Sequence, residues 1–139
     1  MTITELNQFL IGKLTDFEIL EHEKPILAKQ DATGIFKIEE TVPTLIIDSD
    51  QGYFALIISG EREKIEFKQL KKLMNCRKFQ LANPWDLQEK LNLIPGQVPL
   101  IGHQLPCIID NRIFKYDYVY GGTGDSFYTL KIKPDDLVS

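Results

Sequence analysis

The strongest constraint on the fold comes from two almost continuously apolar runs, residues 41–48 and 53–59, separated by the turn Ser49-Asp50-Gln51-Gly52. Both runs are rich in β-branched and aromatic residues, which favour strands, and a turn with Asp and Gly favours a hairpin between them. Because neither run alternates with polar residues, we expect both strands to lie at the centre of a sheet covered on both faces.

Helices and further strands are predicted around this hairpin. Apolar spacing predicts a first helix over residues 4–14 with Thr2 or Thr4 as N-cap, a second over 66–74 and a third beginning at Asn83-Pro84. Residues 26–35 and 134–137 favour short helical segments. Strands are expected near residues 17–22, 78–81, 105–109, 113–120 and 127–132, with a glycine-rich turn at 121–125. The pattern predicts an α+β fold in one domain, residues 1–139.

Composition narrows the class of protein. With 139 residues, 43% of them hydrophobic and 26% charged, the chain is typical of an ordinary globular domain. No apolar run is long enough to span a membrane and the N-terminus lacks a basic leader, so a cytoplasmic location is expected. Cys76 and Cys107 have no partners at ligand spacing and are expected to be reduced residues in or near the core, with no metal site. A net charge of −4 argues against broad non-specific nucleic-acid binding.

A loop from Gly96 to Gly102, which contains Pro99, is the best candidate for a site built from backbone. Glycine permits positive φ and close approach of a ligand, and proline stiffens the turn between the two glycines. The alternative is a plain connection between a helix and a strand.

The helix predicted over residues 66–74 carries a basic face. Six of the sixteen basic residues fall within fifteen positions of the chain, and this face is either simply solvated or contacts phosphates. These residues are Lys64, Lys68, Lys71, Lys72, Arg77 and Lys78.

The order of these motifs resembles the YbaK and prolyl-tRNA-synthetase-associated editing domains, also called the INS-like superfamily. The resemblance covers residues 17–138. The matching pieces, in order, are Ile19-Leu20-Glu21-His22, Thr44-Leu45-Ile46-Ile47, Ser59-Gly60, the basic helix, Gly96-x-Val98-Pro99-x-x-Gly102, Ile108-Ile109-Asp110, Gly121-Gly122 and Ile132-x-Pro134-x-Asp136-Leu137.

This resemblance implies a fold with a central mixed, partly barrel-like sheet and peripheral helices. It also implies an activity, the hydrolysis of the ester of a mischarged tRNA, with alanine or cysteine on tRNA for proline as expected substrates. It implies no metal or organic cofactor. Expected partners are the tRNA acceptor end, its aminoacyl group and a synthetase, but not a membrane. The oligomeric state stays open. Catalysis is expected at His22, Gly96, Gly102 and His103; substrate binding at Thr44, Val98, Pro99, Gly121, Gly122 and Asp125; and tRNA binding at Lys64, Lys68, Lys71, Lys72 and Lys78.

One position departs from the family pattern. The resemblance implies a functional lysine just before Thr44, where this chain has Pro43, which offers neither a side-chain donor nor an N–H. His103 is therefore a candidate substitute at the loop rim, and a solvated loop residue is the alternative. Two further functions stay open: a non-catalytic tRNA-binding module, and a binder of a free amino acid or an aminoacyl analogue. Trp85 is expected in the core, with stacking on an unpaired base as the alternative.

Overall fold

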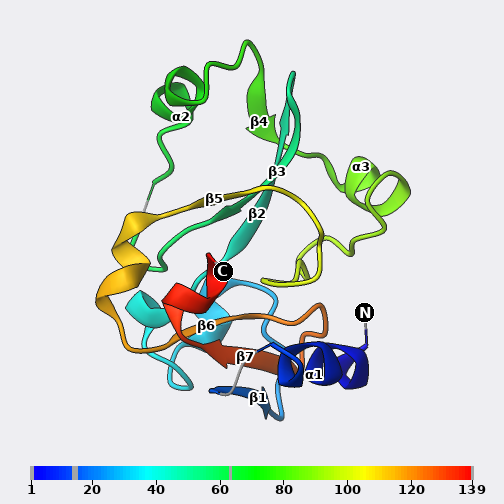
Figure 1. Ribbon diagram of the computed structural model, residues 1–139, viewed down its shortest axis with the longest axis vertical. Helices are drawn as coiled ribbons and strands as arrows, with labels where there is room; N and C mark the ends of the chain where they lie inside the picture. Colours follow the sequence, from blue (N-terminus) through cyan, green and yellow to red (C-terminus); the bar gives the residue numbers. More distant parts are fainter. Residues whose placement is uncertain (1, 14–15, 63, 139) are drawn as a thin grey trace.

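The computed structural model describes residues 2–13, 16–62 and 64–138, and its strands form two sheets (Figure 1). One is antiparallel with the order β1-β7-β6, and the other is mixed with the order β4-β2-β3-β5, in which β5 runs parallel to β3. The predicted α+β fold is confirmed. The strands are β1 (Phe17–Glu21), β2 (Thr44–Ser49), β3 (Gly52–Ile57), β4 (Phe79–Leu81), β5 (Cys107–Ile109), β6 (Val119–Gly122) and β7 (Tyr128–Ile132).

Helices cover the sheets from outside. The α-helices are α1 (Ile3–Ile11), α2 (Phe67–Leu73) and α3 (Pro84–Glu89), and the 3-10 helices are η1 (Lys29–Ala32), η2 (Ile38–Glu40), η3 (Asn111–Lys115) and η4 (Pro134–Leu137). No helix in the described part of the chain is long and apolar enough to cross a membrane.

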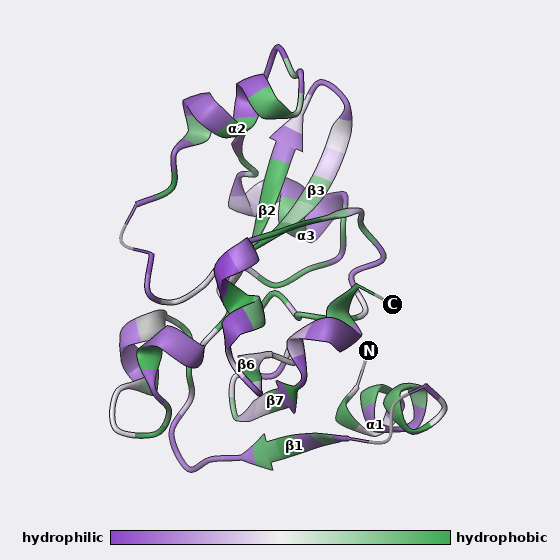
Figure 2. Cartoon of the chain, turned by 60° about the vertical axis from the view of Figure 1, so that its left-hand side comes forward, coloured by the Kyte–Doolittle hydropathy of each residue, from purple (hydrophilic) through white to green (hydrophobic). Residues whose placement is uncertain are grey.

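The central hairpin forms as the sequence predicts. Ile46 pairs with Ala55 on one face of the sheet, where α3 supplies Leu87. Ile47 pairs with Phe54 on the other face, against apolar residues of α2 and β4. Figure 2 shows β2 as hydrophobic along much of its length, whereas α2 carries both hydrophilic and hydrophobic residues. Coverage of both faces explains why neither strand alternates.

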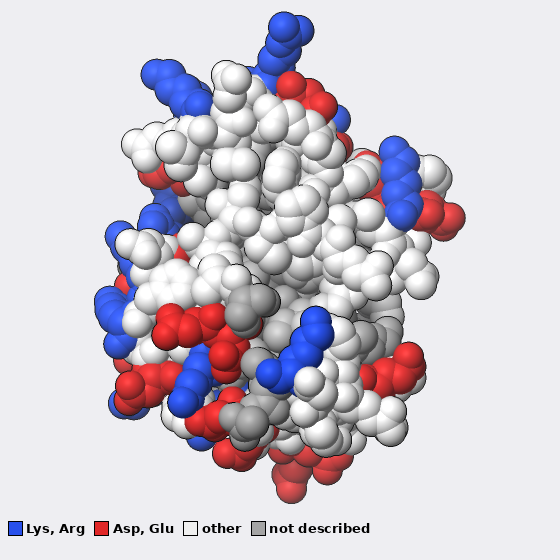
Figure 3. All heavy atoms as spheres, viewed as in Figure 1, with Lys and Arg blue, Asp and Glu red and all other residues white. Residues whose placement is uncertain are grey.

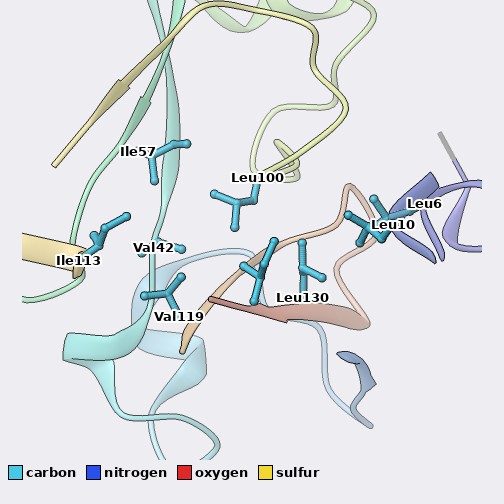
Figure 4. Packing of buried hydrophobic residues seen from close by; sticks show 9 residues of the cluster. Leu6, Leu10, Val42, Ile57, Leu100, Ile113, Val119 and Leu130 are labelled. Atoms are coloured by element: carbon cyan, nitrogen blue, oxygen red, sulfur yellow. The ribbon is translucent and has the colours of Figure 1, made fainter. Parts of the chain in front are cut away.

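The main hydrophobic core joins the two sheets (Figure 4). Ile57 comes from β3, Val119 from β6 and Leu130 from β7, and α1 contributes Leu6 and Leu10. Other buried members are Val42, Leu100, Ile113 and Ile132. The two sheets therefore share one packed interior, which fixes β2 and β6 relative to each other.

Both helix starts that the sequence predicts in detail are confirmed. Thr2 Oγ1 accepts from the Glu5 N–H at 3.1 Å, and the Glu5 carboxylate accepts from the Thr2 N–H at 3.2 Å, which is a capping box. Asn83 Oδ1 accepts from the Asp86 N–H at 2.8 Å, with Pro84 at the first helical position. Leu14, expected on the stripe of α1, lies outside the described residues.

Four expectations are wrong. Trp85 is 63% exposed, because Leu87, two residues further along the helix and so on nearly the opposite side, takes the buried position. Cys107 is exposed because β5 is an edge strand. Residues 113–115, expected as strand, belong to η3, which Asp110 caps. Gly121 and Gly122 pair with β7 as part of β6, so they do not form a turn.

A buried carboxylate fastens the end of β5 to the segment after β3. The side chain of Asp110 is 2% exposed and accepts from Arg62 Nε at 2.5 Å and from the Ser59 N–H at 3.0 Å. Its other oxygen accepts from the Arg112 N–H at 3.1 Å. Burial alone would raise the pKa of Asp110, but these donors outweigh burial and hold the pKa below its usual range.

Asp110→Asn is expected to lower the free energy of unfolding by about 2 kcal/mol at neutral pH, the order of a hydrogen-bonded charge pair. A carboxyl whose folded pKa is depressed contributes stability above its unfolded pKa of about 3.9 and loses it as pH falls through the folded value. The difference between wild type and variant should therefore be constant near pH 7 and shrink below about pH 4. Urea unfolding at several pH values measures it, and a difference that persists unchanged into acid would contradict this account.

Candidate active site

A pocket of about 420 Å³ lies where three segments far apart in the sequence meet. The first is the start of β2 with the residues before it, 41–46. The second is the loop at residues 96–98, and the third is the end of β6 with its connection to β7, residues 120–126. Residues between Ile26 and Phe36 close one side, and Leu81, Ala82 and Leu87 line another. The structure thus brings together Thr44, Gly96, Val98, Gly121, Gly122 and Asp125, all predicted as site residues.

The loop is held against β6 by direct backbone contact. The Leu100 N–H donates to the Gly122 carbonyl at 2.9 Å, and the Leu100 side chain is buried in the main core (Figure 4). A Cβ on Gly121 would lie 2.6 Å from Leu100 Cδ2, and one on Gly122 would lie 2.8 Å from the Val98 carbonyl oxygen. Both positions need glycine because only a bare backbone lets the loop approach this closely.

Positive φ angles shape the loop ends. Gly96 has φ +81° and Gly102 has φ +99°, a region that side chains disfavour. Gln97 Oε1 accepts from the Ser126 N–H at 3.3 Å, which ties the loop to the β6–β7 connection as well. Gly96 lines the pocket, whereas Gly102 and Pro99 lie outside its lining.

Polar groups in the lining are few. Thr44 Oγ1 is buried and has no hydrogen-bond partner in the described structure. Among the lining residues that the structure describes, the one carboxylate is that of Asp125, which accepts from the Phe127 N–H at 3.0 Å through Oδ1 and is otherwise exposed. Among the described lining residues there is no Lys, Arg or His.

His22 lies outside the lining but contacts it through Thr129. Its Nδ1 lies 2.6 Å from the Lys24 carbonyl oxygen, so this nitrogen carries the proton. Its Nε2 lies 3.0 Å from Thr129 Oγ1, and Thr129 lines the pocket. Both ring nitrogens are therefore occupied within the fold.

His103 also lies outside the lining. Its Nδ1 accepts from the Leu105 N–H at 3.0 Å, and its Nε2 lies 3.9 Å from Cys107 Sγ. Partial burial lowers the pKa of His103, which favours the neutral imidazole. The Cys107 residue is exposed as a whole, but partial burial near its thiol raises the thiol pKa. The structure therefore places this pair outside the pocket lining.

The predicted basic residues gather on and around α2, and Figure 3 shows Lys and Arg side chains projecting at that end of the molecule. Lys64, Lys68, Lys71 and Lys72 are exposed. Lys78 Nζ lies 3.0 Å from Asp48 Oδ2, and this hydrogen bond raises the pKa of Lys78. The α2 end is thus a basic surface, and none of these residues belongs to the pocket lining.

Sequence reasoning missed the wall formed by residues 26–36. Phe36 stacks on Tyr120 with ring centroids 4.6 Å apart, and both line the pocket. The segment has no regular apolar period, so nothing in its sequence indicated which residues face the pocket.

The family of the protein follows from its sequence. The chain belongs to the aminoacyl-tRNA editing domain family, whose sequence model matches residues 26–139. This match confirms the resemblance drawn from the motifs. Proteins of this family edit aminoacyl-tRNA.

Solved structures agree on the fold. The hypothetical protein APE2540 is 24% identical with a TM-score of 0.85, and the match covers 96% of this chain and 91% of that one. A proposed trans-editing enzyme for prolyl tRNA synthetase is 17% identical with a TM-score of 0.83, over 99% of this chain and 91% of that one. A proposed signal transduction protein from Marinobacter aquaeolei VT8 is 14% identical with a TM-score of 0.69, over 98% of this chain but 28% of that one. At these identities the likeness establishes the fold alone.

Proposed function

We propose that this protein is a trans-acting editing enzyme that hydrolyses the ester of a mischarged aminoacyl-tRNA in the pocket between β2, the 96–102 loop and β6. One observation carries the proposal: the predicted glycine loop, the glycine pair of β6 and Thr44 line a single cavity in a chain of the editing family. The volume of about 420 Å³ suits a terminal adenosine with an amino acid attached.

The lining favours an uncharged aminoacyl side chain. Most of the wall is apolar, and its described residues present no cation that would pair with an acidic side chain. The carboxylate of Asp125 supplies a partner for the α-ammonium group that every aminoacyl ester carries. Alanine and cysteine esters meet both conditions, and tRNA for proline is the expected carrier.

Ester hydrolysis needs a positioned water and donors where negative charge develops on the carbonyl oxygen. The Leu100 N–H is already bonded to Gly122, whereas the Val98 N–H has no partner among the described residues. Thr44, which also lines the pocket, holds a second unpaired donor in its buried Oγ1, and rotation of this side chain about χ1 would turn the hydroxyl toward the substrate. We assign these two groups to the substrate carbonyl. The free hydroxyl of the terminal ribose orients the water, since both nitrogens of His22 are occupied.

Thr44→Val is expected to raise stability and to lower activity. Removing a buried hydroxyl that lacks a partner should increase the free energy of unfolding by about 1 kcal/mol. Losing a substrate hydrogen bond of about 1.4 kcal/mol should reduce deacylation about tenfold. Thr44→Ser keeps the hydroxyl and is the control. A Thr44→Val variant that is both more stable and fully active would remove Thr44 from the site.

A second function is favoured by the lack of any lysine among the described lining residues. Pro43 lines the pocket at the position where the resemblance implies a lysine. If this replacement abolished catalysis, the protein is a module that binds tRNA without hydrolysing its ester. In both functions the α2 surface binds the tRNA backbone.

Changing Lys68, Lys71 and Lys72 together to Glu is expected to weaken tRNA binding strongly at low salt. Each lost phosphate contact should reduce the slope of log K against log salt by about 1, so the triple variant should lose about 3. Filter binding at several salt concentrations measures the slope. The equal charge change at Lys13, Lys115 and Lys133, also exposed but outside α2, is the control. Equal slopes in the two triple variants would contradict a role for α2.

A further inference from the structure

Thr129 in β7 is a buried polar residue of the pocket lining. The next residue, Leu130, is packed in the main core, and because successive side chains of a strand point to opposite faces, Thr129 points away from that core. Thr129 pairs with Gly122 of β6, and the Cβ that Gly122 lacks would lie 2.8 Å from the Val98 carbonyl oxygen. Side chains of paired residues are close neighbours on one face, so Thr129 lies beside the loop that carries Val98.

His22 determines which way the Thr129 hydroxyl can bond. The Lys24 carbonyl oxygen, 2.6 Å from Nδ1 of His22, can only accept, so Nδ1 carries a proton and Nε2 of the neutral ring is an acceptor. Thr129 Oγ1, 3.0 Å from Nε2, must then donate its one hydrogen to the ring. The His22 N–H donates to the Phe127 carbonyl at 2.9 Å, which holds the histidine in place. With its hydrogen committed, Thr129 Oγ1 can only accept from a group in the pocket.

The substrate of the proposed function has one donor beside the ester that is still unassigned. Its α-ammonium group pairs with Asp125, and its carbonyl oxygen accepts from the Val98 N–H and from Thr44. The free ribose hydroxyl next to the ester carries a single hydrogen, which Thr129 can accept. Donating that hydrogen leaves the lone pairs of the ribose oxygen for the water, and each bond of such a chain strengthens the next.

We propose that Thr129 binds the free ribose hydroxyl of the substrate by accepting its hydrogen, and that His22 fixes the Thr129 hydroxyl in this accepting orientation. The inference rests on the proposed function, because it needs the terminal adenosine in the pocket. His22 is thus a positioning residue that acts through Thr129 and does not itself touch the substrate.

Binding of two matched analogues tests this contact without hydrolysis. The first is alanyl-adenosine with an amide in place of the ester and the neighbouring ribose hydroxyl intact, and the second lacks only that hydroxyl. By calorimetric titration, wild type is expected to bind the first about fivefold more tightly, in the range of one neutral hydrogen bond. Thr129→Val keeps the shape of the side chain and should bind both equally, whereas Thr129→Ser should restore the preference. No preference in wild type, or one that survives in Thr129→Val, would overturn the inference.

His22→Phe tests the orienting role. Phenylalanine keeps an aromatic ring but has no acceptor, so the Thr129 hydroxyl becomes free to donate in other directions. The preference for the analogue with the hydroxyl is expected to fall below about twofold. Thr4→Val changes an exposed threonine of α1 outside the pocket lining and is the matched control, which should bind like wild type. A His22→Phe protein that is folded by thermal unfolding and keeps the full preference would overturn the role of His22.

The two proposals fail in different ways. If wild type hydrolyses no mischarged tRNA but prefers the analogue with the hydroxyl, and Thr129→Val abolishes that preference, the editing function fails and the Thr129 contact stands. If mischarged tRNA is hydrolysed while the preference survives in Thr129→Val, the contact fails and the editing function stands.

Discussion

Gly122→Ala is expected to reduce deacylation about a hundredfold while the protein remains folded. A Cβ at this position would lie 2.8 Å from the Val98 carbonyl oxygen, which is backbone and cannot rotate away. The loop at residues 96–98 must therefore shift, and it carries the N–H that we assign to the substrate. A displacement of about 1 Å from productive geometry costs about 10²-fold in rate. Single-turnover hydrolysis of a mischarged tRNA measures the effect.

Gly12→Ala is the control for Gly122→Ala. A Cβ on Gly12 would meet only ordinary van der Waals contacts, the nearest at 3.6 Å, and its φ of −72° suits any residue. This variant should keep wild-type activity. If Gly122→Ala also kept it, the loop would not contribute the donor, and the proposed arrangement of the site would be wrong.

Gly60→Ala is expected to cause the largest loss of stability, about 3 kcal/mol or more. A Cβ on Gly60 would lie 2.2 Å from Thr41 Oγ1 and closer still to the Ile38 carbonyl oxygen. Neither atom can move freely, because the Gly60 N–H donates to the Thr41 carbonyl at 2.7 Å and Thr41 Oγ1 donates to the Ile38 carbonyl at 2.6 Å. Residues 38–41 must separate from the end of the β3 segment to accommodate the methyl group.

Thermal unfolding measures this loss, which should lower Tm by roughly 10 °C in a chain of this size. Gly12→Ala serves again as the control and should change Tm little. A Gly60→Ala protein with the wild-type Tm would show that residues 38–41 do not pack against Gly60 in solution.

The framework of the fold is predictable because strong local signals agree with it. The apolar hairpin, the Thr2 capping box and the Asn83-Pro84 helix start each depend on nearby residues, and the structure contains all three. Trp85 and Cys107 are exposed, contrary to prediction, because the exposure of a side chain depends on which side of α3 or β5 packs against another layer. Neither segment is long enough for its hydrophobic periodicity to indicate that side.

The site was predictable in part. The structure brings Gly96, Gly121 and Gly122, which the sequence singles out, to one pocket, because glycine at close backbone contacts leaves a signal in the sequence. The wall containing Phe36 leaves none, and the free hydroxyl of Thr44 becomes visible only when its missing partner can be checked in three dimensions. His22 matches a family position in the sequence and was therefore expected to act in catalysis. In the structure, however, both of its ring nitrogens contact other groups of the protein, the Lys24 carbonyl oxygen and Thr129 Oγ1.

The most direct test of the central claim is deacylation of a panel of mischarged tRNAs by the purified protein, with alanine and cysteine esters on tRNA for proline included. The proposed function predicts hydrolysis of at least one uncharged aminoacyl ester well above its spontaneous rate, and loss of that activity in Gly122→Ala. Pro43→Lys is assayed beside wild type. If wild type hydrolyses no ester of the panel, the editing activity is contradicted, and a gain of hydrolysis in Pro43→Lys would then identify the binding module that lost catalysis.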